Sequence, residues 1–150
     1  MRSGWPVHVL AAGVLVWDAQ WKLLMVRTHN RDHLTLPGGL VENGESPAAA
    51  AYREVKEEVG LSIELGLLLA VQHAVIRGEQ LSSVQFVFDS HPIPGEPALQ
   101  LQEEEIADAF WIDPKEAVRR TSRVGAARLS AALAEREKGR GLSVCPDPDS

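Results

Sequence analysis

The sequence contains a single cysteine, Cys145, so no disulfide can form within the chain. Cys145 lies in a segment rich in proline and aspartate, and we expect an inert thiol and a reducing, cytoplasmic location. Long hydrophobic runs are also missing. Residues 7–16 are mostly apolar, but His8 and Gly13 interrupt them and the run is too short to span a bilayer. The run also lacks the organisation of a signal peptide, so we expect a strand and no membrane partner.

Basic residues are in the minority. Fifteen Lys and Arg stand against twenty-one Asp and Glu, which gives a formal net charge of -6. A surface that binds nucleic acid through its phosphates needs clustered positive charge, so the balance argues against such a partner. A small nucleotide is not excluded, because a divalent cation can join acidic side chains to phosphate oxygens.

The length of 150 residues suits one globular domain. A chain of this size buries roughly 70% of the surface that its unfolded form exposes, so it needs no metal or disulfide to fold. We expect a single domain over residues 1–138 and a disordered tail over residues 139–150. A metal site in this chain would therefore be expected to serve a reaction rather than folding.

Alternation of apolar and turn residues predicts a mixed α/β fold without repeats. Two hairpins are expected, the first from residues 7–17 and 21–27 and the second from residues 63–75 and 81–89. Pro37-Gly38-Gly39 is predicted to form a turn. The remaining expected elements are a loop at 91–96, a strand at 109–112, a brief helix from Pro114 and a helix at 124–138.

Residues 47–59 form the clearest predicted helix. Ser46 suits the N-cap, Pro47 the first helical position and Gly60 the C-terminal cap. At 100° per residue, Glu54, Glu57 and Glu58 fall on one face, apart from the apolar residues that would pack on a sheet.

This acidic face has two interpretations. Like charges four residues apart destabilise a helix by roughly 0.2–0.5 kcal/mol, so Glu54 and Glu58 call for a nearby positive charge. Arg53 could pair with Glu57, and acidic faces are more often simply solvated. Alternatively, the three carboxylates could hold Mg²⁺ or a similar hard cation that also binds substrate phosphates. A glycine-containing loop, residues 38–44, leads into the helix and is weak evidence by itself.

The spacing of these residues resembles the complete Nudix box of the Nudix hydrolase family. Every defined position of the box is present between Gly39 and Leu61. The order is Gly39, five residues, Glu45, seven residues, Arg53-Glu54-Val55, one residue, Glu57-Glu58, one residue, Gly60-Leu61. The resemblance implies an α/β/α sandwich with a mixed sheet.

It also implies hydrolysis of a nucleoside diphosphate linked to another moiety, with Mg²⁺ or Mn²⁺ as cofactor and a homodimer as a candidate assembly. Glu57 and Glu58 would be the main metal ligands, Glu54 a further ligand or the base, and the Gly38 carbonyl a backbone ligand. Arg53 would orient the glutamates, while Gly39, Glu45 and Gly60 would support the box structurally.

A fourth carboxylate often joins such sites from a downstream loop. Among Glu103, Glu104 and Glu105 we favour Glu105, six residues before Trp111. The general base is left open between Glu54 and Glu105. Basic side chains ahead of the glycine loop are candidate substrate contacts, although each is more commonly a solvated loop residue: Arg27, His29, Arg31 and His33. Trp17, Trp21, Phe86 and Trp111 could stack on a base, but core packing is the commoner role.

The substrate markers of two subfamilies are missing. Neither the proline associated with ADP-ribose nor the tyrosine associated with dinucleoside polyphosphates occurs between Ser62 and Ser90. We therefore expect a pyrophosphohydrolase that favours a nucleoside triphosphate or a modified nucleotide. An ADP-ribose or other nucleotide-sugar pyrophosphatase is an alternative. A sensor that binds nucleotide without turnover is a further one, although such proteins usually lose box carboxylates. An isoprenoid diphosphate isomerase would be expected to carry additional catalytic Cys or Glu motifs, which the chain does not show.

Overall fold

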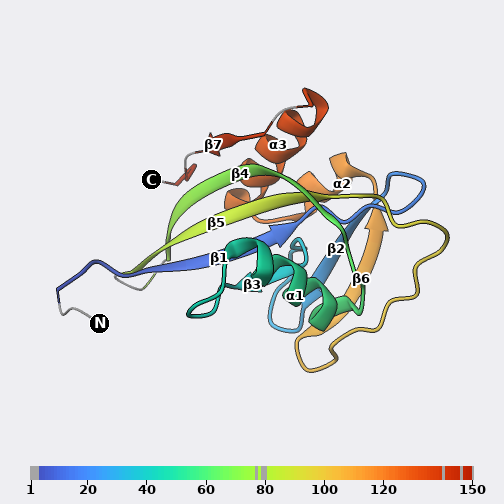
Figure 1. Cartoon of the computed structure of the whole chain (residues 1–150), viewed down its shortest axis with the longest axis horizontal. Helices are drawn as coiled ribbons and strands as arrows, with labels where there is room; N and C mark the ends of the chain where they lie inside the picture. The colour runs from blue at the N-terminus through green and yellow to red at the C-terminus, as the bar shows by residue number, and fades with distance from the viewer. Residues whose placement is uncertain (1–3, 77, 79–80, 140, 146, 150) are drawn as a thin grey trace.

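A five-stranded mixed sheet forms the centre of the molecule (Figure 1). The structure, a computed structural model, describes residues 4–76, 78, 81–139, 141–145 and 147–149. The strand order is β3-β1-β5-β4-β7, and β2 and β6 form a separate two-stranded sheet. The strands are β1 His8–Val14, β2 Leu23–Thr28, β3 Gly38–Leu40, β4 Leu65–Ile76, β5 Leu81–Ser90, β6 Ile106–Ile112 and β7 Ser143–Cys145.

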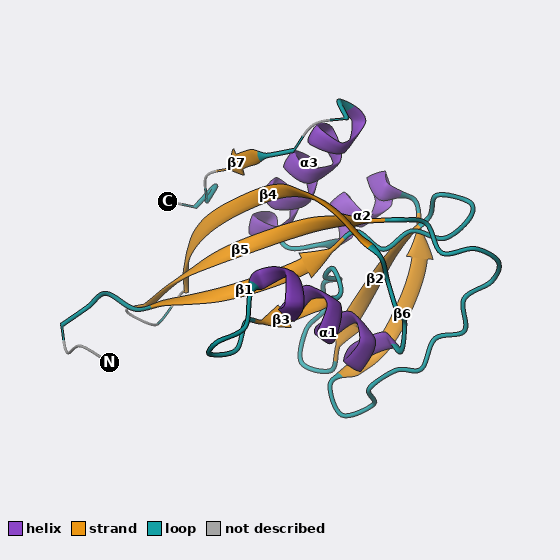
Figure 2. Cartoon of the chain, in the orientation of Figure 1, coloured by secondary structure: helices purple, strands orange, loops and turns teal. Residues whose placement is uncertain are grey.

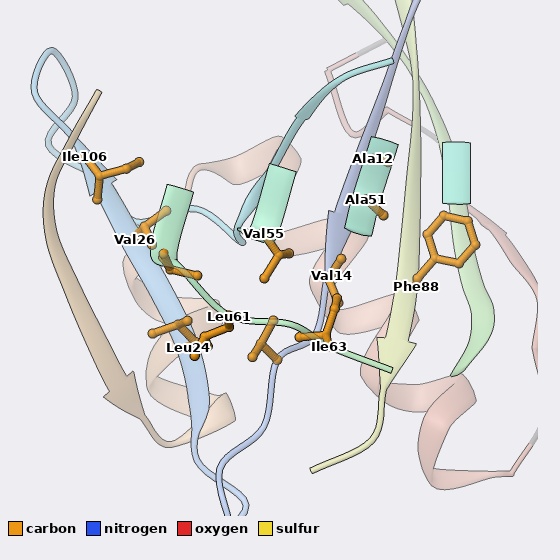
Figure 3. Close-up of a cluster of buried hydrophobic side chains, with 12 residues drawn as sticks. Ala12, Val14, Leu24, Val26, Ala51, Val55, Leu61, Ile63, Phe88 and Ile106 are labelled. Atoms are coloured by element: carbon orange, nitrogen blue, oxygen red, sulfur yellow. The ribbon is translucent and has the colours of Figure 1, made fainter. Parts of the chain in front are cut away.

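Helices cover both faces of this sheet, as Figure 2 shows. They are α1 Pro47–Val59, α2 Pro114–Arg120 and α3 Arg123–Glu137. Successive strand residues point to opposite faces, so Val14 packs in the core beneath α1 and Leu15 in the core beneath α2 and α3. Figure 3 shows Ala51 and Val55 of α1 facing the first of these cores. The expected mixed α/β sandwich is confirmed.

The helix at residues 47–59 and the hairpin of β4 and β5 are confirmed, the latter as an antiparallel pair. The first expected hairpin is wrong over most of its length. The two segments pair only next to the turn that connects them, where the Leu24 N–H donates to the Val16 carbonyl at 2.9 Å. Beyond that point β1 pairs with β3 and β5, while β2 pairs with β6. Long-range partners therefore take the backbone groups that a hairpin would have used.

Two further segments differ from expectation. The predicted turn at Pro37-Gly38-Gly39 is instead the start of β3, which runs antiparallel to β1. In the tail expected to be disordered, β7 lies parallel to β4, with Cys145 buried and its Sγ 3.6 Å from the Val71 carbonyl. Burial raises the pKa of this thiol, which fits an unreactive role. Within the described ranges, no helix is long and apolar enough to cross a membrane.

Candidate active site

Helix α1 presents the acidic face, and both of its ends are capped as its sequence predicts. The Ser46 hydroxyl accepts a hydrogen bond from the Ala49 N–H at 3.1 Å. Gly60 adopts a left-handed conformation with φ of 74°, and its N–H donates to the Lys56 carbonyl. Val55 and Val59 are fully buried beneath the helix, so Glu54, Glu57 and Glu58 are held in a fixed rotational position.

Arg53 ties the loop before α1 to the helix. Its guanidinium makes a bidentate pair with Glu45, with Nε–Oε2 at 2.7 Å and Nη2–Oε1 at 2.9 Å. The Nη2 atom also donates to the Leu40 carbonyl, and Nη1 donates to Glu54 at 2.9 Å and to Glu57 at 3.1 Å. The hydrogen bonds from Arg53 lower the pKa of Glu45 to about 2, and the same pairing raises the pKa of Arg53. The expected roles of Arg53 and Glu45 fit these contacts.

Strand β3 lies so close to α1 and to β1 that its first two residues have no room for side chains. A Cβ on Gly39 would lie 2.5 Å from the Glu54 Cδ. A Cβ on Gly38 would collide with the Ala12 carbonyl oxygen and lie 2.7 Å from the Gly13 Cα. The Gly38 N–H donates to Glu58 Oε1 at 2.7 Å, which joins the edge of the sheet directly to the acidic face.

The carboxylates of this face are not equivalent. Glu58 is only 4% exposed, and burial together with neighbouring glutamates raises its pKa to about 8, against the hydrogen bond from Gly38. Burial also raises the pKa of Glu54, and Arg53 opposes the change. Glu57 keeps half of its side chain exposed. The buried Glu58 and the partly buried Glu54 therefore disfavour negative charge in the absence of a compensating cation.

A cavity of about 610 Å³ opens next to Glu58. The loop between β5 and β6 supplies part of its wall and is fastened to α1, because Gln102 N–H donates to the Glu58 carbonyl. Glu104 and Glu105 from this loop line the cavity, and the negative charge of Glu105 contributes to the raised pKa values of Glu54 and Glu58. Glu103 lies outside it, with its carbonyl 2.6 Å from His29 Nε2.

The candidate substrate residues separate into two groups. His29 and Arg31 line the cavity, whereas Arg27 does not and instead pairs with Asp108 on β6 at 2.5 Å. The aromatic candidates are absent from the described lining. Trp17 is 3% exposed, and Phe86 and Trp111 pack against a core. Trp21 is half-exposed and lies beside Arg136, with 4.7 Å from the guanidinium carbon to the ring centroid. Core packing is thus observed for the other three.

The cavity residues that were not expected from the sequence include Gln85 on β5 and Arg128 on α3. The sequence did carry a signal for Arg128. Gly125, Leu129 and Ala132 are buried at helical spacing, and Arg128 falls within this stripe, where a charge is unusual.

The donor atoms fit a hard divalent cation. Such ions prefer carboxylate oxygens, and a cation would offset the burial and the repulsion that together raise the pKa values of Glu54 and Glu58. In the described part of the chain, no three acidic, histidine or cysteine side chains converge closely enough to enclose an ion. The present contacts explain this, since Arg53 binds Glu54 and Glu57 while the Gly38 amide binds Glu58.

Replacing Arg53 by lysine tests its positioning role. Lysine keeps the charge but cannot reproduce the planar fork that holds Glu45 and the two glutamates. Loss of such supporting contacts commonly costs about 10- to 100-fold in metal affinity or activity. We expect Arg53→Lys to raise the Mg²⁺ concentration needed for half-maximal activity, measured by titration of the rate.

Arg119→Lys is the matched control, because Arg119 is mostly exposed and pairs with Glu116 at helical spacing on α2. An unchanged Mg²⁺ requirement in Arg53→Lys would contradict the positioning role.

Comparisons with known proteins agree with the family resemblance of the sequence. The sequence model of the NUDIX domain matches residues 7–133. A "MutT-like protein" of Streptomyces ambofaciens is 34% identical over 129 residues, which are 85% of this chain and 79% of that protein. An "RNA pyrophosphohydrolase" of Hahella chejuensis is 32% identical over 81 residues, 54% of this chain and 50% of that one.

Solved structures share the fold. The MutT protein of Methanosarcina mazei has a TM-score of 0.72 at 18% identity, covering 93% of this chain and all of that one. The dihydroneopterin triphosphate pyrophosphohydrolase of E. coli has a TM-score of 0.70 at 21% identity, covering 83% and 95%. The match to the domain model and the extended identity to the Streptomyces protein, together with the complete box on α1, place this chain in the Nudix hydrolase family.

Proposed function

We propose that the protein is a metal-dependent pyrophosphohydrolase that cleaves a nucleoside triphosphate or a modified nucleotide. The observation that carries this proposal is the buried carboxyl group of Glu58, which has a pKa raised to about 8, lines a cavity large enough for a nucleotide, and neighbours the partly buried Glu54, whose pKa is also raised. Buried negative charge of this kind costs stability, so a function that brings a cation to it is the simplest explanation. Mg²⁺ is the proposed ion and Mn²⁺ a substitute.

The proposed ligands are Glu57, Glu58, Glu54 and Glu105, with the Gly38 carbonyl as a backbone donor. A divalent ion bound there would offset the negative charge of the pyrophosphate as water attacks phosphorus. Arg53 and Glu45 fix the orientation of the helical carboxylates. The negative charges of Glu54 and Glu105 both help to raise the pKa of Glu58. Either side chain can accept a proton from water at a carboxylate oxygen. His29 and Arg31 are placed to contact the substrate, whereas Arg27, which is occupied by Asp108, is better assigned a structural role.

The relatives' names support the reaction type more strongly than the substrate. They include RNA pyrophosphohydrolases and an "ADP-ribose pyrophosphatase" of Methanocaldococcus jannaschii, 36% identical over 78 residues. An ADP-ribose or nucleotide-sugar substrate is therefore the second candidate. A sensor without turnover is disfavoured because Glu45, Glu54, Glu57 and Glu58 are all present.

A panel of nucleotides, with products identified by mass, tests the proposed function. We expect hydrolysis of a nucleoside triphosphate or modified nucleotide that requires Mg²⁺ or Mn²⁺ and stops on addition of EDTA. The change Glu57→Gln should lower the rate by orders of magnitude, because it removes a proposed ligand from the exposed side of the site. Glu116→Gln is a control, since Glu116 lies on α2, away from the acidic face of α1, and pairs with Arg119 on its own helix.

Activity unaffected by EDTA, or full activity of Glu57→Gln, would contradict the mechanism. Cleavage of ADP-ribose alone would select the second candidate, and binding without any cleavage would select the sensor.

A further inference from the structure

Arg128 is a cationic side chain in the cavity wall that the proposed chemistry does not use. Its Nη1 donates to Gln72 Oε1 at 2.7 Å, and no ion pair joins it to a carboxylate among the residues that the structure describes. Burial lowers its pKa, although a guanidinium remains charged at neutral pH. A partly buried charge with only an amide partner is costly unless a further acceptor reaches it.

The sheet register places Arg128 across the cavity from the acidic face. One row of paired residues runs from Leu40 on β3 through Ala11 and Gln85 to Gln72 on β4. Neighbouring strands lie about 4.8 Å apart, so β3 and β4 are separated by about 14 Å. Glu58 contacts β3 at Gly38, two residues before the Leu40 position of this row, and Arg128 contacts β4 at Gln72. A ligand held at Glu58 therefore has to extend from β3 across β1 and β5 to meet Arg128.

The chemistry of the guanidinium limits what it can receive. Its planar N–H groups match two adjacent acceptors, as on a phosphate or on the O6 and N7 edge of guanine. Gln85 lies on β5, between β3 and β4 in this row, and also lines the cavity, where its amide group can form hydrogen bonds with a ligand. The cavity wall beneath the row is otherwise small or apolar at Ala11, Gly13 and Val87, which leaves space for a ligand.

We propose that Arg128 is a specificity-determining residue that binds two adjacent acceptor atoms on the part of the substrate lying over β5 and β4, away from Glu58. This inference rests on the proposed function, because it treats the cavity as the nucleotide site. The shared chemistry is a paired acceptor, and its two sources are a guanine edge and a phosphate group.

Binding of GMP, AMP and inorganic phosphate tests the assignment, with dissociation constants measured by calorimetry in the presence of Mg²⁺. None of these probes contains a pyrophosphate bond, so the measurement does not depend on turnover. The variants are Arg128→Gln and Arg128→Lys. Arg123→Gln is the matched control on the same helix, because the Arg123 side chain is 75% exposed and pairs with Asp149.

If a guanine edge is the source, Arg128→Gln should weaken GMP by about 10- to 100-fold and leave AMP nearly unchanged, the range given by one bidentate pair. If a phosphate is the source, inorganic phosphate, GMP and AMP should weaken together by a similar factor. In both cases Arg128→Lys should recover only part of the lost affinity, because it keeps the charge without the fork. The control should bind as the unsubstituted protein does.

Three results would overturn the proposal. The first is unchanged affinity for all three probes in Arg128→Gln. The second is full affinity in Arg128→Lys. The third is an equal loss of affinity for GMP and AMP in Arg128→Gln while the affinity for inorganic phosphate stays the same. Thermal unfolding of each variant shows whether it folds, and Arg128→Lys keeps the test open if Arg128→Gln does not. A protein that hydrolyses nothing in the panel yet binds GMP or phosphate through Arg128 would refute the proposed function and retain this assignment.

Discussion

Glu58→Gln is expected to abolish hydrolysis and, at the same time, to stabilise the metal-free protein at alkaline pH. Glutamine keeps an oxygen that can accept the Gly38 N–H, so the contact between β3 and α1 survives. It removes the buried negative charge that a cation would need. Several kcal/mol of transition-state stabilisation should be lost, which is about a thousandfold in rate.

The pH dependence follows from the raised pKa of Glu58. An acid whose pKa rises on folding, here from 4.5 to about 8, imposes no penalty below pH 4.5, where it is protonated in both states. Stability is lost as the pH rises towards 8, by roughly 3–5 kcal/mol in total. In EDTA at pH 9 we therefore expect a Tm higher by roughly 10 °C for Glu58→Gln, and almost no difference near pH 4.

Thermal unfolding in EDTA across this pH range gives the measurement. Glu57→Gln is the matched control, because it removes the same charge from a half-exposed side chain on the same helix. It should lower activity without a comparable gain in Tm. A Glu58→Gln variant with the same Tm as the unsubstituted protein at pH 9 would show that Glu58 carries no burial penalty.

Gly38→Ala is expected to cause the largest loss of stability among these substitutions. The new methyl group would collide with the Ala12 carbonyl oxygen, and φ at Gly38 is 155°, which L-residues rarely adopt. Both obstacles are backbone, so no side chain can move to relieve them. We expect a loss of about 2–4 kcal/mol, together with loss of the β1–β3 pairing and of the hydrogen bond to Glu58.

Urea unfolding measures this loss, and Gly44→Ala supplies the control. Gly44 lies in the loop between β3 and α1 with φ of 80°, but a Cβ there would have nothing within 4 Å. Its substitution should cost only about 1–2 kcal/mol, the penalty of the left-handed backbone. Equal losses for the two variants would mean that the close approach of β3 to β1 adds nothing to stability.

The sequence predicted what local chemistry determines. Ser46 and Gly60 mark the ends of α1 because capping depends on neighbouring residues, and the β4–β5 hairpin depends on strands that are adjacent in the chain. The acidic face was predictable for the same reason, since Glu54, Glu57 and Glu58 are fixed relative to one another by a single helix.

Long-range pairing could not be predicted in this way. Nothing near Gly38 indicates that its strand partner is β1, nor does the sequence near Val14 show that β1 leaves its expected partner for β5. The role of Arg128 in the cavity wall was not predicted, because its hydrogen-bond partner Gln72 is 56 positions away in the sequence. These contacts arise only when the sheet order brings distant segments together.

The sheet order has a consequence for how this molecule can diversify. The β3 end of the cavity is built by the box, whereas the wall on the side of β4 includes Arg128 from α3. The two ends belong to separate stretches of sequence. Changes in the last third of the chain can therefore alter the choice of ligand while the box and its carboxylates stay intact, so selectivity and reactivity can be inherited and engineered separately.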